Sequence, residues 1–146
     1  MKYFLPFVLA SFALSACASR LPQPPEGTPS EYHGAYNRIC SPVDASGLEY
    51  LLEKIDGFGP ALVLIQLWGS LSEADQDLIE LTGEINQGSL IACQTEQDCQ
   101  QLQRGFLLIE TRNGRYPSSG RFWSGSSPAH GKFNALPGQL ESPICG

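Results

Sequence analysis

Serine and histidine close to the C-terminus are the side chains that could carry nucleophilic catalysis. His130 follows a serine-rich stretch that contains Ser119, Ser124, Ser126 and Ser127. A serine hydrolase needs a histidine base beside the serine, an acid that orients the base, and often a G-x-S-x-G turn. The stretch has no such turn and no acid at a matching spacing. The sequence therefore assigns no catalytic residue, and a small hydrolase stays an alternative.

Five cysteines form the second set of reactive side chains. Cys17 stands apart at the end of an apolar N-terminal segment, and the other four are Cys40, Cys93, Cys99 and Cys145. Four cysteines in an oxidising compartment form two disulfides, with three possible pairings. We expect a local bond between Cys93 and Cys99, and a bond between Cys40 and Cys145 that joins the two ends of the domain.

Metal, redox and cofactor chemistry have weaker support in the sequence. No C-x-x-C pair is present, as zinc or thioredoxin-type redox chemistry would need, and His33 and His130 lack ligand spacing. The acids Asp75, Asp77 and Glu80 lack the glycine-containing calcium loop and lie where a helix is predicted. We therefore expect no metal and no cofactor.

The N-terminal segment has the order of a secretory signal: Lys2, an uncharged apolar run over 3–13, and small residues before Cys17. Such a run is too short to stay in a bilayer as a spanning helix. Residues 14–17 (LSAC) resemble the lipobox of bacterial lipoproteins. The resemblance implies that residues 1–16 are removed as a signal peptide and that Cys17 is acylated.

The same resemblance predicts where the protein resides. Lipoproteins of this class carry a diacylglyceryl group and often a third chain such as palmitate, and two or more chains hold a protein firmly on a membrane. Ala18, rather than aspartate, would occupy the second mature position, which implies the outer membrane by similarity to Gram-negative lipoproteins. We expect a protein of the bacterial cell envelope that contacts the membrane through its lipid anchor.

Composition limits the domain count and the partners. Removing 16 of the 146 residues leaves 130, which is enough for one domain with a core. The formal net charge of −6 becomes −7 without Lys2, and this argues against nucleic acid as a partner. Eight acids and no Lys or Arg fall between Ile55 and Gln103, whereas five bases follow from Arg104 onward. Halves of opposite charge can complement each other or steer a polar partner.

Residues 17–36 are rich in proline and predict an extended tether, and residues 37–146 predict one globular domain. Within the domain, apolar residues at i, i+3 and i+4 and capping residues predict helices over 46–57 and 72–88. A third, short helix is predicted over 95–102.

Strands are predicted between these helices. Apolar runs over 61–68 (ALVLIQLW), 89–93 and 106–111 indicate buried strands. Asn113-Gly114 predicts a type I′ hairpin turn, after which a return strand should start at Arg115-Tyr116. Strands that alternate with helices predict an α+β or α/β fold, with a mixed sheet of about four strands, two to three helices and disulfide bridges. The stretch from residue 117 onward predicts a loop-rich tail that Cys145 holds in place.

Arginine and aromatic residues gather in the C-terminal third, and this composition is enriched at binding hot spots. Aromatic rings with polar neighbours also suit sugars. We define a candidate binding patch by these residues: Arg112, Arg115, Tyr116, Arg121, Phe122 and Trp123. The competing interpretation places Tyr116 and Trp123 in the core and leaves the arginines solvated.

The patch resembles the C-terminal signature of the membrane-bound inhibitors of C-type lysozyme. The resemblance lies in residues 113–116 (NGRY), residues 122–125 (FWSG) and a late cysteine. That family consists of small bacterial lipoproteins with an all-β barrel that plug the lysozyme cleft. This chain lacks the lysine that the family places between Ser124 and Gly125, and its predicted helices differ from an all-β barrel.

The sequence thus predicts a membrane-anchored envelope lipoprotein. A role as a non-catalytic binding or assembly component fits the sequence better than a role as an enzyme. Its expected partner is another envelope protein or cell-wall material such as peptidoglycan. A lysozyme-type protein inhibitor is a narrower form of this hypothesis, and a small envelope hydrolase is the alternative from a different class.

Overall fold

A computed structural model describes residues 21–40, 46–68, 76–84, 88–125, 127, 129–141 and 144–145. These residues form nine β-strands and no helix, so the predicted α+β or α/β fold is wrong. The strands are β1 (Ser30–Cys40), β2 (Ser46–Asp56), β3 (Leu62–Trp68), β4 (Leu78–Leu81), β5 (Ser89–Thr95), β6 (Asp98–Gln101), β7 (Gly105–Asn113), β8 (Tyr116–Ser124) and β9 (His130–Pro137).

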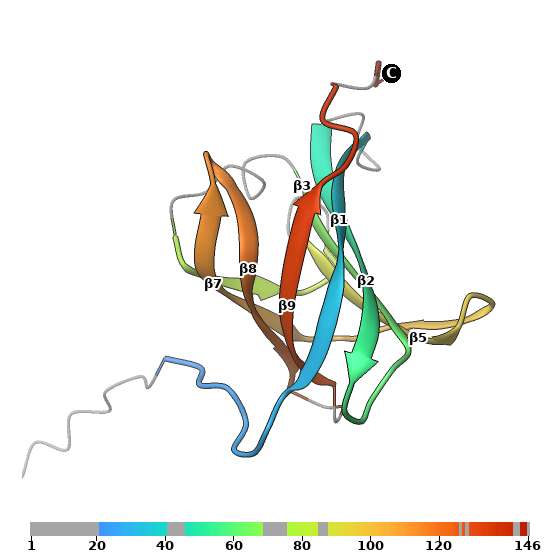
Figure 1. Ribbon diagram of the computed structural model, residues 1–146, viewed down its shortest axis with the longest axis vertical. Coiled ribbons are helices and arrows are strands. Elements are labelled where there is room, and N and C mark those ends of the chain that lie inside the picture. Colours follow the sequence, from blue (N-terminus) through green and yellow to red (C-terminus); the bar gives the residue numbers. More distant parts are fainter. Residues whose placement is uncertain are drawn as a thin grey trace, which may run out of the picture.

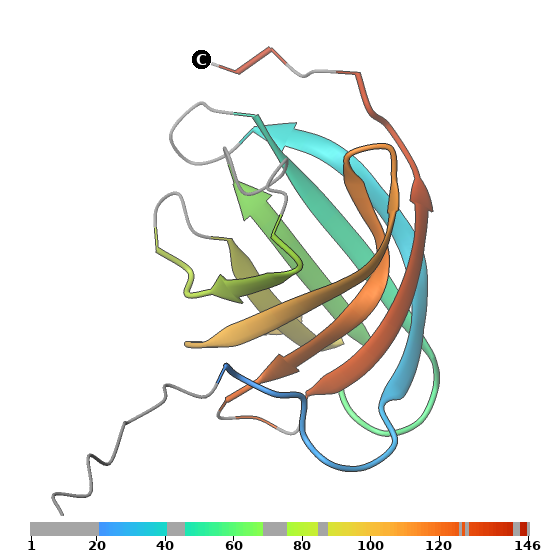
Figure 2. The same cartoon turned by 90° about the vertical axis from the view of Figure 1, so that its left-hand side faces the viewer.

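All the strands belong to one sheet in the order β4-β7-β8-β9-β1-β2-β3-β5-β6. Neighbouring strands are antiparallel except β1 and β9, which run parallel at the middle of the sheet. The sheet curls into a half-barrel around a single interior (Figure 1 and Figure 2). The N-terminal segment enters beside the β2–β3 turn, and the C-terminal tail leaves at the opposite end (Figure 1).

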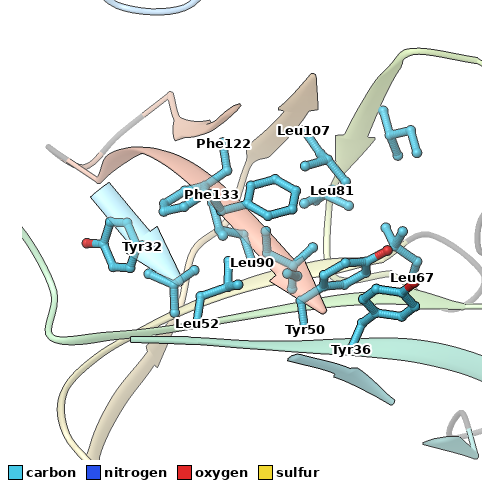
Figure 3. Close-up of a cluster of buried hydrophobic side chains, with 14 of the residues drawn as sticks. Tyr32, Tyr36, Tyr50, Leu52, Leu67, Leu81, Leu90, Leu107, Phe122 and Phe133 are labelled. Carbon is cyan, nitrogen blue, oxygen red and sulfur yellow. The ribbon is translucent and has the colours of Figure 1, made fainter. Parts of the chain in front are cut away.

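Aromatic and aliphatic side chains from most of the strands fill the concave face (Figure 3). The ring of Tyr32 meets Phe122 edge-on at 5.1 Å between centroids, and Tyr50 meets Phe133 in the same way at 5.8 Å. Edge-to-face contacts of this kind add stability beyond the area that they bury. The interior of the half-barrel is therefore a packed core.

Gly131 on β9 makes room for these rings. A Cβ atom built at this position would lie 2.3 Å from the ring of Phe122 and 2.7 Å from the ring of Tyr32. A larger residue here would displace two aromatic side chains of the core. The glycine is thus a packing requirement of the concave face.

The predicted helix over 46–57 is strand β2. Leu48, Tyr50 and Leu52 point into the core and are fully buried, whereas Leu51 and Ile55 are exposed. The true period is two, and the leucine at position 51 makes the sequence imitate the i, i+3, i+4 spacing of a helix. Pairing with β1 and β3 on either side decides the outcome.

The described residues of the other two predicted helices form strands and a turn. Of the segment 72–88, residues 72–75 and 85–87 lie outside the described residues, and Leu78–Leu81 form the edge strand β4. The segment 95–102 contains the β5–β6 hairpin, where Thr95 Oγ1 accepts hydrogen bonds from the backbone N–H groups of Gln97 and Asp98. A threonine that caps a helix can equally close a tight turn.

Both predicted disulfides are present: Cys40 is bonded to Cys145 and Cys93 to Cys99. The strands predicted over 61–68, 89–93 and 106–111 are confirmed as β3, β5 and β7, with the expected turn at Gly114, where φ is +62°. Two boundaries differ from the prediction. β1 begins at Ser30, inside the segment expected to be a tether. The expected return strand is β8, but it continues into the stretch expected to be a loop-rich tail, which also contains β9.

Candidate functional site

The aromatic half of the predicted patch is buried. Phe122 and Trp123 are neighbours on β8, so their side chains point to opposite faces of the sheet. Phe122 is fully buried in the core, and Trp123 is 3% exposed and stacks on Phe106 at 5.5 Å between centroids. Neither ring therefore offers a surface to a partner.

Arg112 and Arg115 lie near the β7–β8 turn. The guanidinium of Arg112 donates to the carbonyl of Gln76 at 3.0 Å and lies 3.7 Å from a carboxylate oxygen of Asp77. The guanidinium of Arg115 lies over the ring of Tyr116, 5.4 Å from its centroid. Both arginines thus have contacts within the protein.

Arg121 belongs to a different region of the sheet. It lies on the outer face of β8, where its Nε is 3.3 Å from a carboxylate oxygen of Glu110. Tyr116 is half-buried, and its hydroxyl accepts a hydrogen bond from Arg38 on β1 at 3.2 Å. The six residues of the predicted patch therefore form no common surface, although Arg112, Arg115 and Tyr116 do lie together.

A row of apolar side chains crosses the outer, solvent-facing side of the sheet. Five neighbouring strands, from β9 to β5, each contribute one residue to it, and the cross-strand pairs follow one another without a break. We call this row the outer stripe, and its members are Leu136, Ala35, Leu51, Leu64 and Ile91. Strands lie about 4.8 Å apart, so the stripe is about 19 Å long.

The exposure of the stripe is highest at two leucines. Leu136 is 75% exposed and Leu51 is 43% exposed, while Ala35, Leu64 and Ile91 are partly buried. Isolated exposed leucines are ordinary on protein surfaces, whereas a contiguous apolar row often marks an interaction site. The outer stripe is therefore the best-supported candidate site in the part of the chain that the structure describes.

Two hollows flank the stripe and share Leu51 and Glu53. One has a volume of about 310 Å³, and it is lined by Leu51, Glu53, Leu62, Leu64, Cys93, Glu96 and Cys99. The other has a volume of about 400 Å³, and it is lined by His33, Gly34, Ala35, Asn37, Leu51 and Glu53. The disulfide between Cys93 and Cys99 forms part of the first hollow and fixes the β5–β6 hairpin beside it.

A row of polar side chains, Glu49, Gln66 and Ser89, runs beside the outer stripe on the sheet. Gln66 Nε2 donates to Glu49 at 2.7 Å, and Ser89 Oγ donates to Gln66 Oε1 at 2.9 Å. Glu49 and Glu53 stand two positions before and after Leu51 on the same strand. The apolar row is therefore bounded by carboxylates on both sides.

Lysine and arginine do not line either hollow among the described residues. Lys54, the lysine of β2, turns away, and its Nζ donates to the carbonyl of Gly59 at 2.9 Å. This side of the sheet can thus accept an apolar surface that carries positive charge. His33 lines one hollow beside Glu53, but the described lining of both hollows contains no serine, threonine or free thiol that this imidazole could activate.

A separate pocket of about 520 Å³ lies where the N-terminal segment enters the sheet. Ser127 and His130 line it together with Glu26, Glu31 and Asp56. The Ser30 hydroxyl donates to the carbonyl of Phe58 and ties the N-terminal segment to the β2–β3 turn.

His130 keeps a buried nitrogen at this pocket. Its Nε2 atom is inaccessible to solvent and has no hydrogen-bond partner in the described structure. Burial, and then the positive charge of Arg121, hold the pKa of His130 below its ordinary value. A neutral imidazole is therefore favoured at this position.

The serines considered for catalysis are dispersed. Ser119 is within 2.6 Å of the Thr111 hydroxyl, and Ser124 Oγ donates to the carbonyl of Arg104 at 3.3 Å. Ser127 lines the pocket with His130, and Ser126 lies outside the described residues. The described contacts pair none of these serines with the histidine.

The described residues form neither a metal-ligand cluster nor a membrane-spanning helix. No three His, Cys, Asp or Glu side chains among the described residues are grouped so that they could hold a metal ion. The described residues also contain no helix that is long and apolar enough to cross a bilayer. Cys17, the predicted lipidation site, lies outside the described residues.

Sequence reasoning missed the outer stripe because it assigned Leu51 to the buried face of a helix. A usable signal was present in 61–68, where Leu62, Leu64 and Gln66 alternate with the core residues Val63 and Ile65. Because side chains alternate with a period of two in a strand, this run predicts one buried face and one partly exposed face that contains Leu64.

Comparisons of the chain with protein-family models, with curated proteins and with solved structures find no match. The resemblances to lipoproteins and to lysozyme inhibitors therefore stay predictions from the sequence.

Proposed function

We propose that this chain is a lipid-anchored protein of the bacterial envelope that binds another envelope protein and has no catalytic role. The outer stripe carries this proposal, because it is a continuous apolar row on a face that solvent would otherwise cover. Cell-wall glycan is less well supported as the partner, because Phe122 and Trp123, which could have stacked on sugars, are buried.

The lipobox and the disulfides support the location. A disulfide-bonded domain suits an oxidising compartment outside the cytoplasm. Cys17 is 13 residues from Ser30, where β1 begins, so an extended chain between them would reach at most about 45 Å. An acylated Cys17 would keep the domain close to the membrane and leave the outer stripe free for a neighbour.

Cross-linking of the native lipoprotein in intact cells tests the proposal. After affinity purification, mass spectrometry should find one stoichiometric envelope protein in the wild-type sample. The same protein should be lost when Leu51→Asp replaces the wild type. Recovery of peptidoglycan fragments without any protein partner would contradict the proposal.

Lysozyme inhibition is a second candidate because of the fold. The family that the signature resembles is all-β, and this chain is a curled all-β sheet with the two signature segments on the β7–β8 hairpin and the end of β8. Addition of the purified domain to a C-type lysozyme should then slow cell-wall lysis. Full lysozyme activity at a large excess of the domain would remove this candidate.

A further inference from the structure

We infer that the outer stripe binds a cationic amphipathic segment of the partner protein. The inference rests on the proposed function and specifies the chemistry of the occupant. Three observations support it: the apolar row itself, the carboxylates that border it, and the absence of lysine and arginine from the described lining of the two hollows.

The length of the outer stripe indicates how long the apolar face of the bound segment should be. A row of about 19 Å matches one face of a helix of about 13 residues, at a rise of 1.5 Å per residue. Leu51 and Leu64 lie at its centre as a direct cross-strand pair, and the more exposed Leu136 lies at one end. An occupant with leucine-like side chains along one face would cover these residues.

The carboxylates beside the stripe indicate which charge the bound segment should carry. Glu49 and Glu53 flank Leu51 along β2, and Glu96 lines the same hollow as Leu64. Glu53 and Glu96 are exposed, and no described hydrogen bond or ion pair occupies their carboxylates. Lysine or arginine on the edges of the bound segment would complement them and would speed its encounter with this acidic protein.

A second copy of this chain is a poorer occupant. Two arginines of its outer face, Arg104 just before β7 and Arg121 on β8, already have acidic neighbours within the chain. Lys132 on β9, opposite Arg121, is exposed and has no described acidic partner. Arg104 Nε is 2.8 Å from Glu80, and Arg121 Nε is 3.3 Å from Glu110. Docking a second copy through the arginines would require these contacts to be given up, and Lys132 alone would leave most of the carboxylates beside the stripe unpaired. A separate cationic segment therefore fits the surface better.

Designed peptides test the inference on the full mature chain with Cys17→Ser, which removes the acylation site. The probe is a 14-residue helical peptide with leucine on one face and lysine on the other. The comparison peptide has glutamate in place of each lysine. We expect the lysine peptide to bind, more weakly at 300 mM than at 50 mM NaCl, and the glutamate peptide to show no binding.

Matched variants locate the binding. Leu51→Ser with Leu136→Ser should weaken the lysine peptide at least about tenfold, the equivalent of 1.4 kcal/mol. Phe58→Ser with Ile144→Ser removes two exposed apolar side chains away from the stripe and should have no effect. Glu53→Gln with Glu96→Gln should weaken binding several-fold, whereas Glu26→Gln with Glu141→Gln makes the same change in net charge and should not.

Equal binding of both peptides, or equal losses in the stripe and control variants, would overturn the inference. Self-association of the protein through Leu51, detected by sedimentation, would overturn it too. A cross-linked partner that touches the stripe through an acidic or uncharged segment would also overturn the inference, but it would leave the proposed function standing.

Discussion

Leu51 of β2 lies directly opposite Leu64 of β3 on the solvent-facing side of the sheet. Their strand neighbours Leu52 and Ile65 point the other way and are fully buried. The core is therefore complete without the outer pair. Two facing leucines with acidic neighbours are better explained by a partner than by the stability of the sheet.

Leu51→Asp should leave the fold intact and abolish partner binding. The side chain is 43% exposed and contributes mainly to a cross-strand pair, so we expect a loss of stability below about 1 kcal/mol. Urea unfolding measures the stability, and co-purification measures the binding. A loss above about 3 kcal/mol would show that the leucine belongs to the core.

Trp123→Ala should lower the free energy of unfolding by about 3–5 kcal/mol, because the ring is buried and stacked on Phe106. Denaturant unfolding tests this, with Arg115→Ala as the exposed control, which should change little. A Trp123→Ala protein of unchanged stability that lost its partner would restore the aromatic patch as the binding site.

Loss of the Cys40–Cys145 bond should cost more than loss of Cys93–Cys99. The first bond spans a sequence separation of 105 and the second a separation of 6. Chain entropy assigns about 5 kcal/mol to the long loop and about 2 kcal/mol to the short one. Paired Cys→Ala variants and unfolding midpoints measure the difference, and equal costs would contradict this loop-length argument.

Stability should fall as the pH decreases through about 6.5, the ordinary pKa of histidine. Burial and Arg121 hold the pKa of folded His130 lower, so in this range the unfolded chain binds a proton that the folded protein does not. The loss should level off below the folded pKa. Comparing unfolding free energies of wild type and His130→Asn at pH 8 and pH 5 tests this, since the variant should show the smaller decrease.

Local signals in the sequence predicted much of the β-structure and the disulfides. Runs such as ALVLIQLW and the Asn113-Gly114 turn depend on neighbouring residues alone, and both appear as expected. Assigning Cys17 to lipidation left four cysteines. Their positions along the chain favoured one local pair and one pair between the ends of the domain, and these are the two bonds that form.

The fold class was wrong because it depends on contacts between distant residues. β2 has a spacing that fits a helix or a strand, and pairing with β1 and β3 decides between them. The outer stripe was missed for the same reason. Its five members come from residues 35 to 136 and become neighbours only through the register of the sheet.

Site-specific photocross-linking in living cells tests the central claim most directly. A photoreactive amino acid would replace Leu51 in the outer stripe or, as the control, the partly buried Leu108 on the outer face of β7. The account predicts a single protein adduct from position 51 and none from position 108. No adduct at position 51, or the same adduct from both positions, would contradict it.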